Sequence, residues 1–433
     1  MSDVQRRYPE SLEITPFTRV PQGRVNIPGS KSITNRAFVL AALGNSIGCE
    51  LHGILHSEDT EVMMNSLTAL GFHIETTGPT SVHIRSTNCK VRIPAQSADL
   101  YVANSGTTMR FLSAMVSVGK GRYRLDGIPR MRERPIQDLL TALQQMGINA
   151  TSETNNGCPP VVIQTTGLNG GHVRIRGDVS SQFLSAILMI APFAKTDVII
   201  EVEGVLVSEP YVEMTVAMMR QWGLKVSNES GQYAIPGNQN GVCSAYHIEP
   251  DASAASYFFA LAAITGGRIT VPNLSMSSLQ GDIHFVDALE KMGCTIERNE
   301  NEISVQGPKE LTGIDIDMNA ISDTVMTLGA VACFAEGPTT IRNVGHIRHK
   351  ETDRITALAN ELRKVGAEVE VWDDGLRITP DELRGALIAT YNDHRMAMSL
   401  ALVGVRVPGI VIENPGCVAK TYPGFFDDLE WFR

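Results

Sequence analysis

Two kinds of helical apolar pattern alternate along the chain. The first is amphipathic and ends in glycine, in "MMNSLTALGF", "IQDLLTALQQMGI", "EMTVAMMRQWGL", "FVDALEKMGC" and "ALANELRKVGA", where apolar residues recur every three or four positions. The glycines lie 70 to 76 residues apart (147 − 71 gives 76, 293 − 223 gives 70), and they are Gly71, Gly147, Gly223, Gly293 and Gly366. Each stands where the end of a helix favours a left-handed residue, and a strand-like alternation such as "AEVEV" follows. The spacing predicts a repeated helix, turn and strand.

The second kind of pattern is apolar on nearly every side, which is typical of a buried helix. Its six segments are "KSITNRAFVLAALG", "SGTTMRFLSAMVSVG", "SSQFLSAILMIAPFA", "ASAASYFFALAAITG", "SDTVMTLGAVACFAEG" and "DHRMAMSLALVG". Their small side chains would let the helices pack closely. A turn and a short strand follow, as in "GRITVPN". Together the two patterns predict six α/β units of about 70 residues each.

Six units can form one solenoid or two bodies of three. A solenoid would carry polar capping repeats at its ends, and the sequence shows none. The segments "NIPGS" and "HIEPDAS" lie three units apart and place proline beside small turn residues, as linkers do. We therefore expect one domain of three repeats over 28–248 and a discontinuous one over 1–27 plus 249–433, with the active-site cleft between them at a double hinge.

Composition narrows the possible functions. Of 433 residues, 43% are apolar and 19% charged, and 37 basic against 47 acidic residues give a formal net charge of −10. A general nucleic-acid binder would present a basic surface, so any basic site must be local. The longest apolar stretch, "FLSAILMIAPFA", is too short to span a bilayer, and "MSDVQRRYPESLEITP" lacks the apolar run of a signal peptide. We expect a cytoplasmic protein, and a monomer because two domains already supply a cleft.

The seven cysteines, at positions 49, 89, 158, 243, 294, 333 and 417, include no C-x-x-C pair and have no histidine nearby at zinc-ligand spacing. We expect reduced, mostly buried thiols, no metal site, and no catalytic cysteine, since none has the electropositive neighbours that activate a thiol. The common nucleotide-binding, zinc-protease and hydrolase signatures are also absent.

The segment "RHKETDR", at 348–354, is unusually basic for this acidic chain. A charge run usually faces water. Here, however, the apolar stripe of the following helix includes Ile355 and Leu358. The residues four positions before these two, on the same helix face, are Glu351 and Arg354. Both charges therefore point toward the core, where each must be paired or await a partner. An anionic ligand at this helix N-terminus would satisfy Arg354.

The buried helices begin with serine, threonine, glycine and cations. A single serine, asparagine or aspartate there is most often an N-cap, but lysine and arginine oppose the helix dipole. Several such helix ends indicate a site for more than one phosphate or carboxylate. The residues concerned are Ser30, Lys31, Ser32, Arg36, Asn104, Ser105, Gly106, Thr107, Arg110, Ser180, Ser181, Gln182, Asp393, His394 and Arg395.

Further charged residues add to this set. The basic residues of "RMRERP" and "VAKTYP" could equally belong to a solvated surface or to the anion site. They are Arg130, Arg132, Arg134 and Lys420. Asp323 opens a buried helix, where a cap is the simple alternative. Glu351 lies among cations that could hold its carboxylate ready for proton transfer.

These motifs resemble those of the enolpyruvyl transferase family, and in particular of the branch that acts on shikimate 3-phosphate. The matching segments follow the family's order along nearly the whole chain: "PGSKSITNRAFVLAALG", "NSGTTMRF", "RMRERPI", "SSQFL", "SEPYVE", "KETDR", "YNDHRMAM" and "AKTYP". The resemblance implies an α/β fold, a two-domain inside-out α/β barrel built of six βαβαββ repeats, three per domain, with buried parallel helices. It also implies transfer of the enolpyruvyl group of phosphoenolpyruvate to the 5-hydroxyl of shikimate 3-phosphate. This step of aromatic amino-acid biosynthesis runs through a tetrahedral intermediate, releases phosphate and needs no metal or organic cofactor.

The resemblance implies the site residues as well. Those for shikimate 3-phosphate are Lys31, Ser32, Arg36, Ser180, Ser181, Gln182, Ser208, Tyr211, Asp323, His346 and Lys350. Those for phosphoenolpyruvate are Lys31, Asn104, Gly106, Arg134, Gln182, Glu351, Arg354, His394, Arg395 and Lys420. On this basis we assign Glu351, assisted by Lys31, to the proton transfers at the methylene carbon, and Asp323 to the substrate hydroxyl.

The chain departs from the family's pattern in two places. His346 stands where an asparagine often contacts the sugar-like substrate. Ser105, Thr108 and Phe111 replace the common alanine, alanine and proline beside the phosphoenolpyruvate pocket. We therefore expect sensitivity to the inhibitor glyphosate to differ from the commoner pattern, in a direction that the sequence does not fix.

Two other functions stay open. The related transferase for UDP-N-acetylglucosamine carries a cysteine, in most members, in the loop that corresponds here to "DGIPRMRERP", and this stretch has none. A non-catalytic anion-binding repeat protein would need the cations, but not Glu351 and Asp323 as separate acid–base groups.

Overall fold

The computed structural model describes residues 8–44, 48–88, 91–229 and 231–433. Contacts divide the chain into two compact units, unit 1 (Met1–Pro28, Glu249–Arg433) and unit 2 (Gly29–Ile248). Pro28, which the sequence analysis assigned to the domain over 28–248, belongs to unit 1, where its carbonyl accepts a hydrogen bond from the Asp251 N–H at 2.9 Å. The double hinge stays a prediction.

Unit 2 contains three sheets of one topology, in which a parallel pair is extended by two antiparallel strands. The first sheet runs β14(Ala245–His247), β3(Cys49–His52), β5(Ser81–Ser86), β4(Phe72–Gly78). The second runs β6(Ser97–Tyr101), β7(Gly121–Asp126), β9(Val161–Thr165), β8(Asn149–Ser152). The third runs β10(Gly171–Arg176), β11(Val198–Glu203), β13(Gln232–Ile235), β12(Ser227–Glu229). The helices are α1(Lys31–Gly44), α2(Glu58–Ala69), α3(Gly106–Met115), α4(Gln137–Gln145), α5(Ser181–Ile190) and α6(Pro210–Gln221).

Unit 1 repeats this topology twice and shortens it once. Its four-stranded sheets run β2(Gln22–Arg24), β15(Arg268–Pro272), β17(Glu302–Gln306), β16(Thr295–Arg298) and β19(Asp315–Asp317), β21(Thr339–Arg342), β23(Gly375–Thr379), β22(Glu368–Trp372). The short sheet runs β24(Leu387–Ile388), β25(Val411–Glu413), β1(Ser11–Glu13), and a small pair joins β18(Leu311–Thr312) to β20(Ala335–Glu336). The helices are α7(Ala252–Thr265), α8(Phe285–Lys291), α9(Val325–Ala332), α10(Arg354–Lys364), α11(His394–Gly404) and α12(Phe425–Trp431).

Strands β2 and β14 do not pair with the next strand along the chain, as β6 does with β7; instead, each pairs with the strand that follows the other one. Strand β2 precedes α1 along the chain, yet it pairs in parallel with β15, through Gln22 and Arg268. Strand β14 precedes α7, yet it pairs in parallel with β3, through Ala245 and Glu50. Each strand completes the sheet of the unit that the chain is about to leave.

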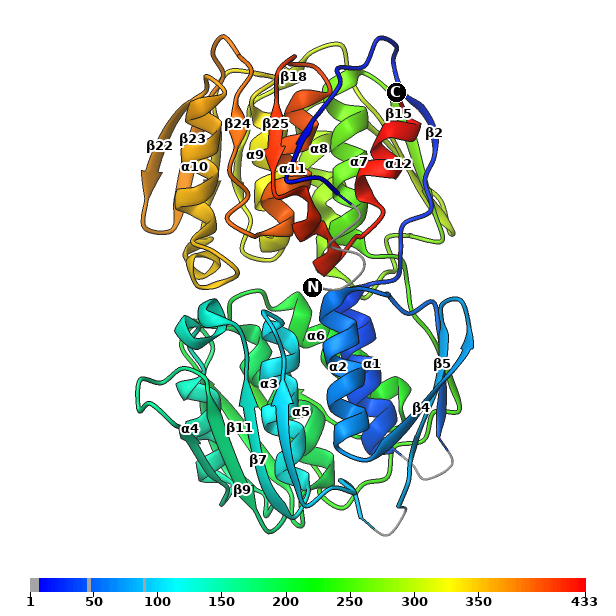
Figure 1. Cartoon of the computed structure of the whole chain (residues 1–433), viewed down its shortest axis with the longest axis vertical. Coiled ribbons are helices and arrows are strands. Elements are labelled where there is room, and N and C mark those ends of the chain that lie inside the picture. The colour runs from blue at the N-terminus through cyan, green and yellow to red at the C-terminus, as the bar shows by residue number, and fades with distance from the viewer. Residues whose placement is uncertain (1–7, 45–47, 89–90, 230) are drawn as a thin grey trace. The chain divides into compact units, whose positions relative to one another are not determined.

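The six segments that are apolar on all sides form the buried helices, as expected. Every residue of α3, α9 and α11 is buried. Helices α1, α3 and α5 pack side by side in unit 2, and α7, α9 and α11 do so in unit 1 (Figure 1). The sheets and the amphipathic helices therefore surround these helices, because an all-apolar helix is stable only where no side meets water.

The glycines that were predicted to end the amphipathic helices adopt the left-handed conformation. Their φ values are +91° at Gly71, +83° at Gly147, +75° at Gly223, +104° at Gly293 and +112° at Gly366. A side chain would be strained there. The α/β fold of six related units, three in each body, is thus confirmed, and within the described ranges the sheets stay separate instead of joining into one hydrogen-bonded barrel.

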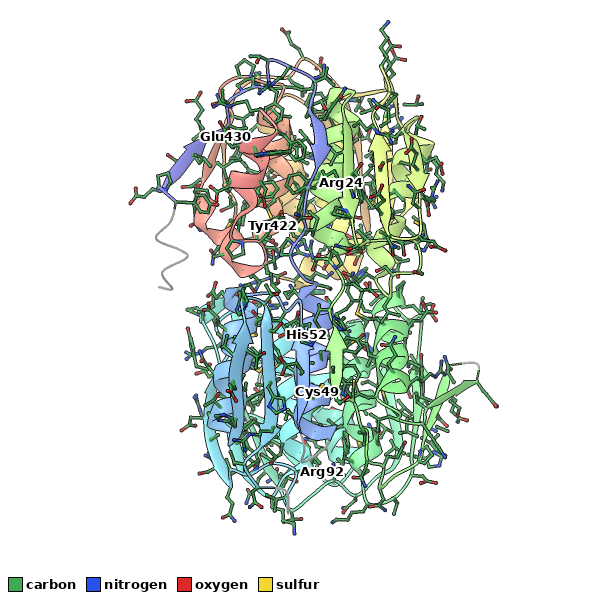
Figure 2. All side chains as sticks on the ribbon, turned by 90° about the vertical axis from the view of Figure 1, so that its right-hand side faces the viewer. Arg24, Cys49, His52, Arg92, Tyr422 and Glu430 are labelled. Carbon is green, nitrogen blue, oxygen red and sulfur yellow. The ribbon has the colours of Figure 1, made fainter. Side chains whose placement is uncertain are left out.

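The described cysteines are mostly buried, as the sequence indicated. Cys49 opens β3, and His52 closes it (Figure 2). Burial raises the pKa of Cys294 and of Cys333 to about 12, so neither thiol supplies a thiolate at neutral pH. Cys89 lies outside the described residues. Across the part of the chain that the structure describes, no helix is both long and apolar enough to cross a bilayer.

Candidate active site

In unit 1, Arg354 is the centre of a buried charge cluster. It is the first residue of α10 and is only 1% exposed. Its Nε and Nη2 donate to the two carboxylate oxygens of Asp393 at 2.8 and 3.2 Å, Nη2 also donates to Glu351 at 2.8 Å, and Nη1 donates to Asp323 at 3.2 Å. Burial alone would lower the pKa of Arg354, but these carboxylates hold it above its ordinary value. The charge that the sequence placed on the core face is therefore paired by acids of the chain itself.

Asp323 joins three cations. Its carboxylate accepts hydrogen bonds from Lys350 Nζ at 2.5 Å, Arg354 Nη1 at 3.2 Å and Arg395 Nη2 at 2.7 Å. Arg395 also contacts the Tyr257 hydroxyl at 3.3 Å. Burial lowers the pKa of Lys350, against the opposing effect of Asp323. Asp323 is thus an ion-pair partner, and the simple alternative of an N-cap does not hold, since the turn that it belongs to has no side-chain cap.

Glu351 lies between two cations. One oxygen accepts a hydrogen bond from Arg354 at 2.8 Å, and the other lies 3.8 Å from Lys420 Nζ. Glu351 is 8% exposed and Lys420 is 5% exposed. Both carboxylate oxygens of Glu351 therefore face a positive charge in a largely desolvated place.

Two histidines belong to the same cluster. Burial, and then the charge of Lys350, lowers the pKa of His346 to about 3, so this ring is neutral at physiological pH. His394 is fully buried, with Nδ1 3.6 Å from an Asp393 oxygen. All the predicted site residues of unit 1 are thus brought together.

In unit 2, the start of α1 carries two of the predicted cations. Lys31, 9% exposed, pairs with Asp59 at 3.5 Å. Arg36 is almost fully buried and donates to Thr215 Oγ1 at 2.7 Å and to the Tyr211 carbonyl at 3.0 Å. Burial lowers the pKa of Arg36 to about 10.

The start of α3 lies against Arg134. Arg134 is 5% exposed and donates to the Asn104 carbonyl at 3.1 Å. A Cβ on Gly106 would lie 2.4 Å from an Arg134 guanidinium nitrogen, so a larger residue here would require this guanidinium to move. Arg130, by contrast, is partly exposed and pairs with the exposed Glu133, and the exposed Arg132 pairs with Asp126, so the interpretation as solvated surface holds for both arginines.

The predicted serines lie at neighbouring helix starts. Ser180 caps α5 by accepting a hydrogen bond from the Gln182 N–H at 3.3 Å, and Gln182 Nε2 donates to Thr107 Oγ1 at 3.4 Å. Ser208 has φ +50° and precedes α6, and its carbonyl accepts a hydrogen bond from the Tyr211 N–H at 3.1 Å. Ser32 and Ser181 lie in the first turns of α1 and α5.

Three partners of the predicted residues, one in unit 2 and two in unit 1, were not foreseen. Asp59, the partner of Lys31, lies in the first turn of α2, whose start is closed by a capping box. An acid at this position is explained by helix stability alone, so it did not point to a site. Tyr257 is hidden in an all-apolar helix. Asp393 was noted only as a helix start, and its pairing with Arg354 spans 39 residues. Among the described residues, no group of histidine, cysteine, aspartate and glutamate is placed to hold a metal ion.

Known proteins are similar to this chain in sequence and in fold. The pattern of the family EPSP synthase (3-phosphoshikimate 1-carboxyvinyltransferase) matches residues 16–429. A 3-phosphoshikimate 1-carboxyvinyltransferase of Nostoc punctiforme is 50% identical over 96% of this chain and 98% of its own length. One from Shewanella oneidensis is 46% identical over the same shares. An EPSP synthase structure from Acinetobacter baumannii superposes with a TM-score of 0.82 at 26% identity, over 98% of each chain. The chain therefore belongs to the EPSP synthase family of transferases.

Proposed function

We propose that the chain transfers the enolpyruvyl group of phosphoenolpyruvate to the 5-hydroxyl of shikimate 3-phosphate. The reaction uses the charge cluster of unit 1 and the predicted residues at the helix starts of unit 2. Family membership supports the reaction. The observation that supports the residue roles is the cluster of unit 1, in which four cations, Lys350, Arg354, Arg395 and Lys420, face three carboxylates. The excess positive charge suits substrates that carry phosphate and carboxylate groups.

The chemistry needs a proton on the methylene carbon of phosphoenolpyruvate. Glu351, assisted by Lys31, delivers it, and the adjacent carbon becomes cationic. The 5-hydroxyl oxygen attacks that carbon while Asp323 accepts the hydroxyl proton. The resulting tetrahedral intermediate loses a proton from its methyl group to Glu351 and expels phosphate, which leaves the enol ether.

The cations stabilise the charges that the reaction creates. Arg134, Arg354 and Arg395 bind the phosphate and carboxylate of phosphoenolpyruvate, and Lys420 and Gly106 complete this group. Arg354 and Arg395 are already fixed by carboxylates, so little reorganisation is needed when the transition state forms. Lys31, Ser32, Arg36, Ser180, Ser181, Ser208, Tyr211, Asp323 and Lys350 bind shikimate 3-phosphate.

Phosphate release tests the proposal. The purified chain should release phosphate from phosphoenolpyruvate with shikimate 3-phosphate, but not with UDP-N-acetylglucosamine. Glu351→Gln should lower kcat by about 100-fold or more, as loss of a proton-transfer group does. The matched control is Glu370→Gln, on an exposed residue of β22, which should leave kcat unchanged.

Other outcomes would contradict the proposal. Release with UDP-N-acetylglucosamine alone would assign the sister reaction. A chain that binds both anions without releasing phosphate, and that binds them equally after Glu351→Ala and Asp323→Ala, would be a binding protein. We further propose a cytoplasmic monomer, and that glyphosate competes with phosphoenolpyruvate for the same cations.

A further inference from the structure

A buried carboxylate that has no part in the proposed reaction holds the segment before α11. Glu361 lies on α10 and is 0% exposed. Its Oε1 accepts a hydrogen bond from the Tyr391 hydroxyl at 2.8 Å, and its Oε2 accepts from the Ala389 N–H at 3.0 Å and from Lys364 Nζ at 2.7 Å. Two of these three donors belong to one short turn.

That turn has an unfavourable backbone. Tyr391 and Asn392 are consecutive left-handed residues, with φ +54° and +53°. Residues with side chains seldom adopt this conformation, and bulky ones least of all. Neighbouring groups must therefore hold the turn in place. Glu361 does so at Tyr391, and Asn414 Nδ2 donates to the Asn392 side-chain oxygen at 3.1 Å.

The turn leads directly into the charge cluster. Asp393 follows Asn392, and it accepts hydrogen bonds from Arg354 on both oxygens and from the Arg395 N–H at 2.9 Å. Arg354 and Glu361 lie seven residues apart on α10, which places them on the same face two turns apart. One helix thus fixes both ends of 389–393, with Glu361 at the start and Arg354 at the end.

We infer that Glu361 and the Tyr391 hydroxyl are positioning groups for the reaction. They hold the turn in its left-handed conformation, and this conformation places Asp393, which in turn orients the Arg354 guanidinium and caps the start of α11, the helix that carries Arg395. Neither group touches a substrate or a reacting atom in this account. The inference rests on the proposed function for the ligand that Arg354 and Arg395 bind.

Steady-state kinetics on the full chain tests this inference. Tyr391→Phe removes one hydroxyl from a residue that is 41% exposed, so the core stays intact. We expect kcat/KM for phosphoenolpyruvate to fall about tenfold, mostly through KM, since small misplacements of binding groups are costly. The KM for shikimate 3-phosphate should change less than twofold. Glu361→Gln removes the negative charge and one of the two acceptor oxygens that the three donors share, and it should have a larger effect of the same kind.

A matched variant controls for the loss of a tyrosine hydroxyl. Tyr246→Phe, in unit 2, removes a hydrogen bond to Gln221 Oε1 of 2.9 Å, close in length to the 2.8 Å bond between Tyr391 and Glu361. This variant should leave both KM values unchanged. Thermal unfolding shows whether each variant folds. If Glu361→Gln does not fold, Tyr391→Phe decides.

The outcomes separate this inference from the proposed function. A wild-type chain that releases no phosphate would overturn the function and the inference together. An active wild type whose folded variants keep the wild-type KM for phosphoenolpyruvate, or show only a lowered melting temperature, would overturn the inference alone.

Discussion

At the scale of single residues, charged side chains on the apolar face of a predicted helix correctly indicated buried charges. It placed Glu351 and Arg354 inside the protein, and both are buried. It could not identify their partners, because Asp323 and Asp393 lie 31 and 39 residues from Arg354, and periodicity reports only local neighbours. The anionic partners of Arg354 in the structure are therefore three carboxylates of the chain, and a substrate as a further partner stays a prediction.

Removing Arg354 should destabilise the fold strongly. Arg354→Ala leaves Asp323, Glu351 and Asp393 without their shared cation in a buried place, which we expect to cost about 3–5 kcal/mol in the free energy of unfolding. Urea denaturation measures this loss. Arg377→Ala, on an exposed residue of β23, should change it by less than about 0.5 kcal/mol. Equal losses in the two variants would mean that the cluster contributes nothing specific to stability.

His346 should make the stability depend on pH. Its pKa of about 3 in the folded protein lies below the usual 6.5, so the unfolded chain binds a proton first as the pH falls. The stability that this group contributes is full above pH 6.5 and declines below it, by about 2 kcal/mol at pH 5. His346→Asn should therefore lose less stability than the wild type between pH 7 and pH 5 in urea denaturation. Parallel losses would show that burial of this ring is not maintained in solution.

At the scale of elements, the start of α3 explains how three unusual residues fit. Ser105 caps α3 through the Thr108 N–H, and their hydroxyls lie 2.8 Å apart. Phe111 is fully buried, and the Arg36 guanidinium lies 5.1 Å from the centre of its ring. The two hydroxyls therefore fix the start of α3, and the Phe111 ring links this helix to a predicted substrate cation, Arg36.

Substitution toward the common pattern should alter inhibition by glyphosate. Ser105→Ala removes the cap of α3, at a cost of about 1 kcal/mol, and Phe111→Pro removes both the ring and a backbone donor inside the helix. Either change should shift the glyphosate inhibition curve relative to the KM for phosphoenolpyruvate. Curves that superpose on the wild type would refute the idea that α3 sets this sensitivity.

The helices were predictable and several strands were not. Long segments with a helical period, and glycines at their ends, specify α2, α4, α6, α8 and α10 well. Strands β1, β2 and β14 have three residues each, too few for an alternating pattern, and their partners are distant in sequence. The exchange of β2 and β14 follows from long-range pairing, which no local pattern records.

At the scale of the whole molecule, the period of about 70 residues carried most of the information. It gave six units, and within the described residues the structure has five four-stranded sheets of one topology and a shorter, three-stranded one, besides the small pair β18 and β20. The sixth is completed by β1, from the other end of the chain, so a reading of consecutive repeats could not assign it. The charges at the helix starts indicated a site for phosphate and carboxylate groups, whereas the reaction itself was implied only by the resemblance to a known family.

The pairing of β1 with the last strand also has a consequence for synthesis. Ser11 pairs with Glu413, so about 400 residues are made between them, which takes roughly 20 to 80 seconds at about 5–20 residues per second. All the described strands of unit 2 lie within 29–248, so they are made before β2 or β1 has a partner strand in unit 1. During translation β1 therefore has no partner strand until β25 has been made, although unit 2 can already fold, and until then its unpaired edge is open to pairing with other chains.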